Sequence, residues 1–253
     1  KWHWRRLAML GISVISFCRV VGDHARRCGV KNVLDVRFAF DPAELSGLPG
    51  DPRKVVLWER GNVSFSAVKA FFRPEDVDKV LIVRRDEEDL SYEPISPADA
   101  AAYHVEIKDG GFLPKDEYLA LLSEPGVYFA PRFKEGIGMS FLEQMAMGKC
   151  VIAHDAPTMN EYIESGRNGI LVDLRHPRWI AAQEIASARS GVLESARSLY
   201  GQWRADEQKI LDFFDGLDDT EPLRSPWTIK SCTSYLMYWL EGVKMRLLVN
   251  ERL

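Results

Sequence analysis

The chain has 253 residues, of which 46% are hydrophobic and 28% charged, so it can bury a sizeable core in one large domain or two small ones. Its formal net charge is −4, with 33 basic against 37 acidic side chains, and this balance argues against nucleic acid as a partner. The four cysteines, at positions 18, 28, 150 and 232, show neither metal-ligand nor Cys-x-x-Cys spacing, which indicates reduced thiols in a cytoplasmic protein.

The N-terminal segment is basic and then apolar, in an order that superficially resembles a signal peptide. It lacks a small-residue cleavage pattern, and its apolar run over residues 7–18 is shorter than the roughly 20 residues that span a bilayer. We therefore predict a buried strand at Ile12–Phe17, a helix from Arg19, a strand at Val33–Arg37 and a hinge at Asp41–Pro52.

The next segment has the pattern of a strand, a helix and a strand. Lys54–Trp58 and Val80–Arg84 are compact apolar runs, and Val63–Phe72 between them is predicted to be helical. This order predicts a βαβ unit with a right-handed crossover in a parallel sheet. A polar loop is expected at Asp86–Ala102, because this stretch is rich in acidic residues and proline.

A further strand is predicted at Tyr103–Ile107, followed by an amphipathic helix at Asp116–Ser123. Gly126–Pro131 is then predicted as a short buried strand that ends at its proline, and Met139–Met147 as an amphipathic helix that ends at Gly148. The residues between this strand and this helix must therefore form a turn.

That turn opens the segment EGIGMSFLE, in which Glu135 and Glu143 flank two glycines. Glycine permits positive φ and lets a ligand approach main-chain N–H groups, and the N-terminus of the following helix attracts anions. An ionised carboxylate only accepts hydrogen bonds, so it matches the hydroxyls of a sugar or a ribose. The combination suits a nucleotide-sugar pocket.

Two simpler interpretations of the same residues remain open. Ser140 and Glu143 have the spacing of a capping box, in which Glu143 would only cap its own helix. Glu135 would then be an ordinary solvated carboxylate in a loop.

Alternating strands and helices continue after this motif. A strand is predicted at Gly148–Asp155, a loop and helix at Ala156–Ile163, and a turn and strand at Ser165–Val172. The whole stretch APRFKEGIGMSFLEQMAMGKCVIAHDAPTMNEYIESGRNGILV resembles the donor-binding half of retaining glycosyltransferases with the GT-B fold, most closely family four. That family has an E-x7-E pair, a G-x-P-V-I-A strand, a P-E turn and G-x-N-G-x-L-V in this order.

The resemblance implies roles for individual residues. Glu143 would hold the ribose hydroxyls and Glu135 the donor sugar, while the backbone of the intervening turn would face the diphosphate and sugar. Arg60 would neutralise the diphosphate, Lys134 would substitute for a family lysine that no Lys-Gly pair supplies here, and Glu161 would keep the family's acidic position. The turn residues concerned are Gly136, Ile137, Gly138 and Met139.

The resemblance also implies an architecture: an α/β fold with a Rossmann-like parallel sheet flanked by helices, and a helical C-terminal extension. Residues 1–45 would be the remnant of an N-terminal acceptor domain with its hinge, residues 46–215 the nucleotide-sugar-binding domain, and residues 216–253 the helical segment. Two-domain enzymes of this kind are longer and this chain begins without methionine, so we expect a fragment.

Helices are predicted over much of the C-terminal part, at Pro177–Ala188, Leu193–Phe214 and about Trp227–Val249. The last of these is both aromatic and basic. Such a helix packs against its own protein or lies on a membrane surface.

The predicted activity is transfer of a hexosyl group from a nucleotide sugar to an acceptor, with retention of configuration. The acceptor would be a glycan, a polysaccharide or a lipid-linked molecule, and the location cytoplasmic or membrane-associated. No metal or other cofactor is expected, because the protein itself supplies positive charge. Two alternatives are a sugar-nucleotide epimerase of the same fold and a non-catalytic module that binds nucleotide sugars.

Overall fold

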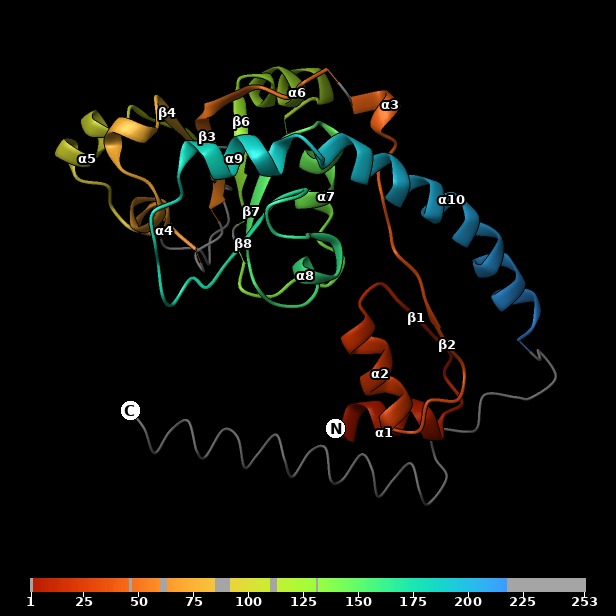
Figure 1. Ribbon diagram of the computed structural model, residues 1–253. Coiled ribbons are helices and arrows are strands. Elements are labelled where there is room, and N and C mark those ends of the chain that lie inside the picture. Colours follow the sequence, from red (N-terminus) through yellow and green to blue (C-terminus); the bar gives the residue numbers. More distant parts are fainter. Residues whose placement is uncertain are drawn as a thin grey trace, which may run out of the picture. The chain divides into compact units, whose positions relative to one another are not determined.

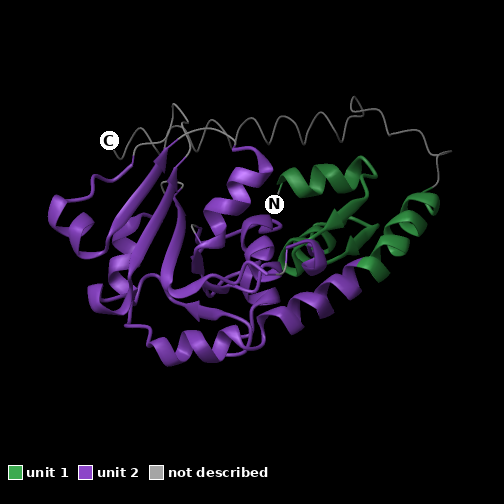
Figure 2. Cartoon of the chain, turned by 90° about the horizontal axis from the view of Figure 1, so that it is seen from above, with its two compact units in different colours: residues 1–37, 204–253 green, residues 38–203 purple. Residues whose placement is uncertain are grey.

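The structure is a computed structural model that describes residues 2–45, 47–59, 63–84, 92–109, 113–130 and 132–217. The chain divides into two compact units, residues 1–37 with 204–253 and residues 38–203 (Figure 2). Each unit is described by itself. The predicted domain boundaries remain predictions.

The first unit contains a small βαβ element. Its helices and strands are α1 (Trp2–Met9), β1 (Val14–Ser16), α2 (Arg19–Arg27) and β2 (Val33–Asp35). The two strands pair in parallel, with Val14 opposite Val33. Both predicted strands and the helix between them are confirmed, whereas α1 was not predicted.

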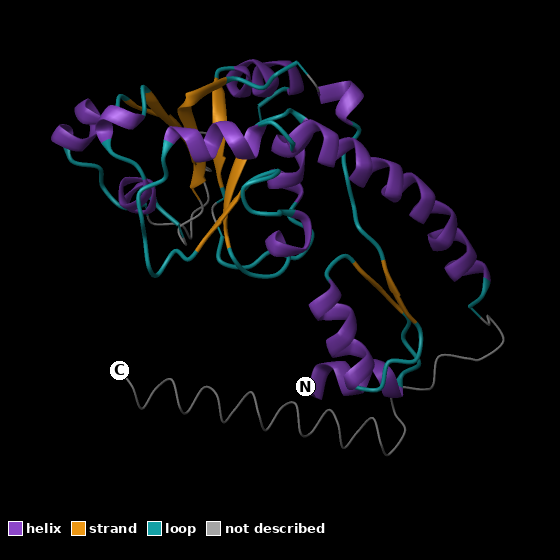
Figure 3. Ribbon diagram, in the orientation of Figure 1, coloured by secondary structure: helices purple, strands orange, loops and turns teal. Residues whose placement is uncertain are grey.

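The second unit is built around a parallel sheet of six strands in the order β5-β4-β3-β6-β7-β8 (Figures 1 and 3). The strands are β3 (Asp51–Glu59), β4 (Lys79–Arg84), β5 (Val105–Asp109), β6 (Pro125–Phe129), β7 (Cys150–His154) and β8 (Ile170–Val172). Every residue of β6 and β7 is buried, as expected for central strands covered on both faces. The predicted α/β fold class is confirmed.

Helices cover both faces of this sheet (Figure 1). They are α3 (Pro42–Leu45), α4 (Phe65–Phe71), the 3-10 turn η1 (Pro74–Asp76), α5 (Pro97–Ala102), α6 (Lys115–Ser123), α7 (Met139–Ala146), α8 (Met159–Tyr162), α9 (Ala182–Arg189) and α10 (Val192–Asp215), whose residues from Arg204 onward belong to the first unit. One core joins α4 and α9 to one face, and a second core joins α3, α6, α7 and α8 to the other. Alternate residues of β3 enter the two cores, Val55 the first and Val56 the second.

Three of the predicted elements need correction. The expected polar loop contains α5, because the Ser96 hydroxyl accepts a hydrogen bond from the Asp99 amide and caps a helix whose first residue is Pro97. The expected hinge contains α3, which begins after Asp41, and its last residues, from Asp51, already belong to β3.

The helix predicted from Pro177 begins only at Ala182. The reason is that the Ile180 amide donates to the carbonyl oxygen of Phe71, and the Ile180 side chain is buried in the first core. The predicted helix at 227–249 lies outside the described residues. In the part of the chain that the structure describes, no helix is long and apolar enough to cross a membrane.

Candidate functional site

The connections of the sheet place a topological switch point at the carboxyl ends of β3 and β6. These two strands are neighbours, and the chain proceeds from β3 toward β4 and β5 on one side and from β6 toward β7 and β8 on the other. The helices that follow them, α4 and α7, pack on opposite faces. Ligands of open α/β sheets bind at such a switch point, so residues 132–138, which lie between β6 and α7, are where a site is expected.

Gly138 shapes the start of α7. It has φ +78° and is the N-cap residue of the helix, and a Cβ atom at this position would lie 2.0 Å from the ring of Phe141. Only glycine meets both conditions without strain. Gly136 has open space around it and no positive φ, so only one of the two predicted turn glycines is required by the backbone.

The N-terminus of α7 is open to a ligand. Among the described residues, no side chain caps it and no acidic residue lies in its first turn. Met139, the first residue of the helix, is 52% exposed. The free N–H groups and the helix dipole therefore favour an anion at this position.

Glu135 lies in the loop before this helix and is largely buried. Its side chain is 12% exposed, and its Oε2 lies 3.5 Å from Nη1 of Arg132. The main chain of the loop is held by Thr158, a fully buried residue whose hydroxyl lies 2.8 Å from the carbonyl oxygens of both Glu135 and Gly136. The interpretation of Glu135 as a solvated loop carboxylate is therefore wrong.

Glu143 lies inside α7 and faces Tyr118 of α6. The Tyr118 hydroxyl donates to Glu143 Oε2 at 2.5 Å. Burial raises the pKa of the Glu143 carboxyl, against the opposing influence of the Tyr118 hydrogen bond and the nearby Lys115. The capping-box interpretation is wrong, because Gly138 is the N-cap residue and Ser140 is already the second residue of the helix, with no cap bond from a side chain.

An aromatic pair lies beside Glu143. The ring centroids of Trp58, near the end of β3, and Tyr118 are 6.0 Å apart, and both side chains pack against the second core. Burial and the adjacent carboxylate raise the pKa of the Tyr118 phenol, so it stays protonated and donates its proton to Glu143.

The remaining predicted site residues have different placements. Lys134 is exposed in the loop and Ile137 packs against the second core. Glu161 lies on α8, the helix that Thr158 precedes. Arg60 lies outside the described residues. Within the described ranges, no group of three or more His, Cys, Asp or Glu side chains is arranged to hold a metal ion.

Sequence reasoning missed an ion pair at the same edge of the sheet. Glu59 ends β3 and Arg84 ends β4, opposite each other in register, with Arg84 Nε 2.6 Å from Glu59 Oε2. Their side chains are 1% and 12% exposed. Glu59 also accepts a hydrogen bond from the Phe65 amide, and Arg84 stacks over the ring of Tyr92. The available signal was a charged residue at the end of each adjacent strand.

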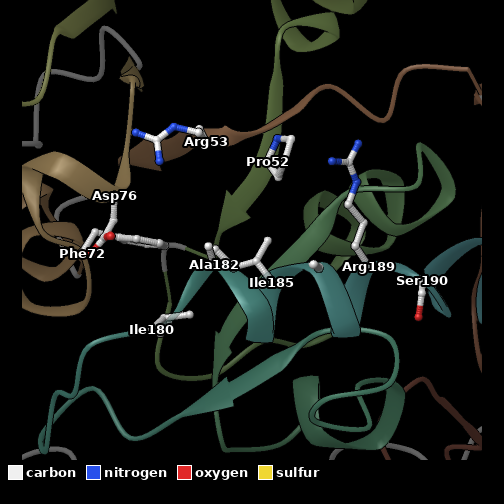
Figure 4. Close-up of a pocket in the computed structure, with 10 residues that line it drawn as sticks. Pro52, Arg53, Phe72, Asp76, Ile180, Ala182, Ile185, Arg189 and Ser190 are labelled. Atoms are coloured by element: carbon white, nitrogen blue, oxygen red, sulfur yellow. The ribbon is translucent and has the colours of Figure 1, made fainter.

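A pocket of about 570 Å³ lies at the opposite, amino-terminal edge of the sheet. Figure 4 shows Ile185 and Arg189 of α9 across from Pro52 and Arg53 at the start of β3. The two guanidinium groups of this pocket already have partners within the chain. Arg53 pairs with the Asp78 carboxylate 2.8 Å away, and Arg189 donates to the main-chain carbonyls of residues 49 and 50. This pocket is separate from the predicted site residues.

Comparisons with known proteins support the α/β fold of this chain. Residues 72–188 match the family described as glycosyl transferases group 1. No curated protein matches the chain significantly. HepE from Anabaena, solved in complex with UDP and glucose, matches with 15% identity and a TM-score of 0.58, over 81% of this chain and 63% of that chain.

Two further solved structures match in the same way. Sucrose-phosphate synthase from Thermosynechococcus elongatus has 17% identity and a TM-score of 0.57, over 82% of this chain and 59% of that chain. A glycosyltransferase from Rickettsia africae has 13% identity and a TM-score of 0.56, over 85% and 67%. The chain thus shares the α/β fold of GT-B glycosyltransferases, spans about 63% of the length of HepE, and matches the group 1 glycosyl transferase family over residues 72–188.

Proposed function

We propose that this chain is the donor-binding half of a glycosyltransferase that takes a sugar from a nucleotide sugar and transfers it with retention of configuration. One observation carries the proposal: Glu135, the open N-terminus of α7 and the half-buried Glu143 follow one another at the switch point of the sheet. A sugar, a diphosphate and a ribose follow one another in the same order in a nucleotide sugar.

Each part of the donor then has a partner of suitable chemistry. The amides at the start of α7 bind the diphosphate, and Glu143 and Glu135 accept hydrogen bonds from hydroxyls of the ribose and of the sugar. Catalysis is electrostatic. Hydrogen-bond donors of the protein that are preorganised around the departing diphosphate stabilise its developing negative charge by about 3–4 kcal/mol each. Arg60 and Lys134 are the proposed cationic contributors. The proposal requires no metal cofactor.

The comparisons favour a particular donor class and leave the acceptor as a proposal. HepE is described in complex with UDP-glucose, so a uridine diphosphate hexose is the first donor to test. A carbohydrate or a lipid-linked acceptor would bind against surfaces beyond the donor site. Contact with a membrane surface is proposed for the segment 227–249 only.

Calorimetry of the full chain with UDP, GDP and their glucose and mannose conjugates tests donor binding. Glu143→Ala should weaken binding of nucleotide and nucleotide sugar alike, whereas Glu135→Ala should remove only the extra affinity that the sugar gives. Glu75→Ala, an exposed carboxylate at the amino-terminal edge, is the matched control and should change neither. A folded chain that binds none of these compounds would overturn the proposal.

The stereochemistry is tested by NMR of the anomeric carbon in the product formed with an acceptor. Retention requires the same anomeric configuration in donor and product. Conversion of the nucleotide sugar into an epimer without acceptor would instead identify an epimerase.

A further inference from the structure

The Glu143 carboxylate is incompletely satisfied by the protein. Its Oε2 accepts one hydrogen bond, from the Tyr118 hydroxyl, and within the described residues no group donates to Oε1. An ionised carboxylate offers about four acceptor positions, and burying one with few donors is unfavourable. A ligand hydroxyl at Oε1 would supply the missing donor.

Tyr118 has little freedom at this contact. Its hydroxyl carries a single proton, which Glu143 of α7 receives over 2.5 Å. The Tyr118 ring also lies beside Trp58 of β3, with the ring centroids 6.0 Å apart. Contacts from α7 and β3 thus hold the phenol.

We propose that Tyr118 is a positioning residue for ribose recognition: it holds Oε2 of Glu143 and thereby presents Oε1 to a hydroxyl of a bound ribonucleoside diphosphate. This inference rests on the proposed function and deepens it. Without the phenol proton, the carboxylate can turn about its side-chain torsions, so its hydrogen bond to the ligand loses its fixed direction.

The consequence is specific to the ribose hydroxyls. A hydrogen bond to a charged group changes affinity by roughly 10- to 100-fold when it is lost. The folded chain should therefore bind UDP or GDP about that much more tightly than the 2′,3′-dideoxy analogue, which has no hydroxyl for Glu143. Removing the Tyr118 hydroxyl should bring this ratio down to within about threefold.

The experiment measures both affinities by calorimetry for the full chain, Tyr118→Phe and a matched control, Tyr103→Phe. Tyr103 is a second tyrosine with a hydrogen-bonded hydroxyl; it is buried in the other core and donates to the Phe72 carbonyl 2.9 Å away. The control should keep the ratio of the parent chain. In the double variant Tyr118→Phe/Glu143→Gln, the tyrosine change should add no further loss of ratio to that of Glu143→Gln alone.

The outcomes distinguish a failure of the proposed donor binding from a failure of the role proposed for Tyr118. If the folded parent chain binds neither UDP nor GDP, the proposed function fails and the role of Tyr118 fails with it. If the parent chain prefers the ribonucleotide and Tyr118→Phe preserves that preference, only the role of Tyr118 is refuted. Equal weakening of both nucleotides would show that Tyr118 supports the fold alone. If Tyr118→Phe does not fold, an unchanged ratio in Glu143→Gln would overturn the proposal.

Discussion

Lys149 is a buried lysine whose replacement should change how stability depends on pH. It immediately precedes β7, and its side chain is fully buried, with the ammonium donating to the carbonyl oxygens of Leu122 and Pro125. Burial lowers its pKa from 10.5 to about 7, and the nearby Arg189 contributes in the same direction. The perturbation is Lys149→Met, which keeps a long side chain and removes the titrating group.

The sign and size of the effect follow from proton linkage. Between pH 7 and the ordinary lysine pKa, the unfolded chain keeps this proton while the folded chain has lost it, so stability rises with pH. For a folded pKa of about 7, the gain between pH 7 and pH 9 is about 2 kcal/mol. The methionine variant lacks this gain, so its stability relative to the parent chain should fall by that amount.

Urea unfolding at pH 7, 8 and 9, followed by circular dichroism, measures this difference. The variant also leaves two main-chain carbonyls without their donor, which lowers its stability by about 1–3 kcal/mol for each group at every pH. This offset does not affect the slope. Lys108→Met changes a side chain that is 53% exposed. The free energy of unfolding of this control variant should depend on pH in the same way as that of the parent chain. Parallel curves for Lys149→Met would refute the reasoning.

Three further outcomes are expected. Glu59→Gln should destabilise the fold by about 3–5 kcal/mol in urea unfolding, because it leaves the mostly buried Arg84 without its counter-charge, and a change below 1 kcal/mol would contradict this. Gly138→Ala should lower the free energy of unfolding by about 2–4 kcal/mol, because the position has positive φ and the new Cβ would collide with the Phe141 ring. Gly136→Ala should have little effect, because Gly136 has neither constraint. Equal losses in the two variants would contradict this explanation. Glu143→Gln should raise thermal stability at pH 7 but not at pH 3, because a carboxyl whose pKa is raised by burial is unfavourable only when ionised; a loss of stability at pH 7 would oppose this.

Much of the second unit could be predicted from local sequence. The runs that became β6 and β7 are continuous and apolar because both faces of these strands are covered, and α7 shows the helical period with glycine at each end. The elements that were missed or misplaced depend on capping or on distant contacts. Ser96 and Pro97 begin α5 within an acidic, proline-rich stretch, and Ile180 stays outside the helix because its amide donates to the Phe71 carbonyl.

The candidate site shows the same division. By itself, the sequence determined that two carboxylates and two glycines lie at a junction of strand and helix, because that pattern is local. Only the tertiary structure decided their partners: Tyr118, 25 residues before Glu143, and Thr158, 23 residues after Glu135. The register of two parallel strands likewise brings Arg84 to Glu59. Such pairings are set by how strands and helices pack, and packing joins residues that no sequence spacing brings together.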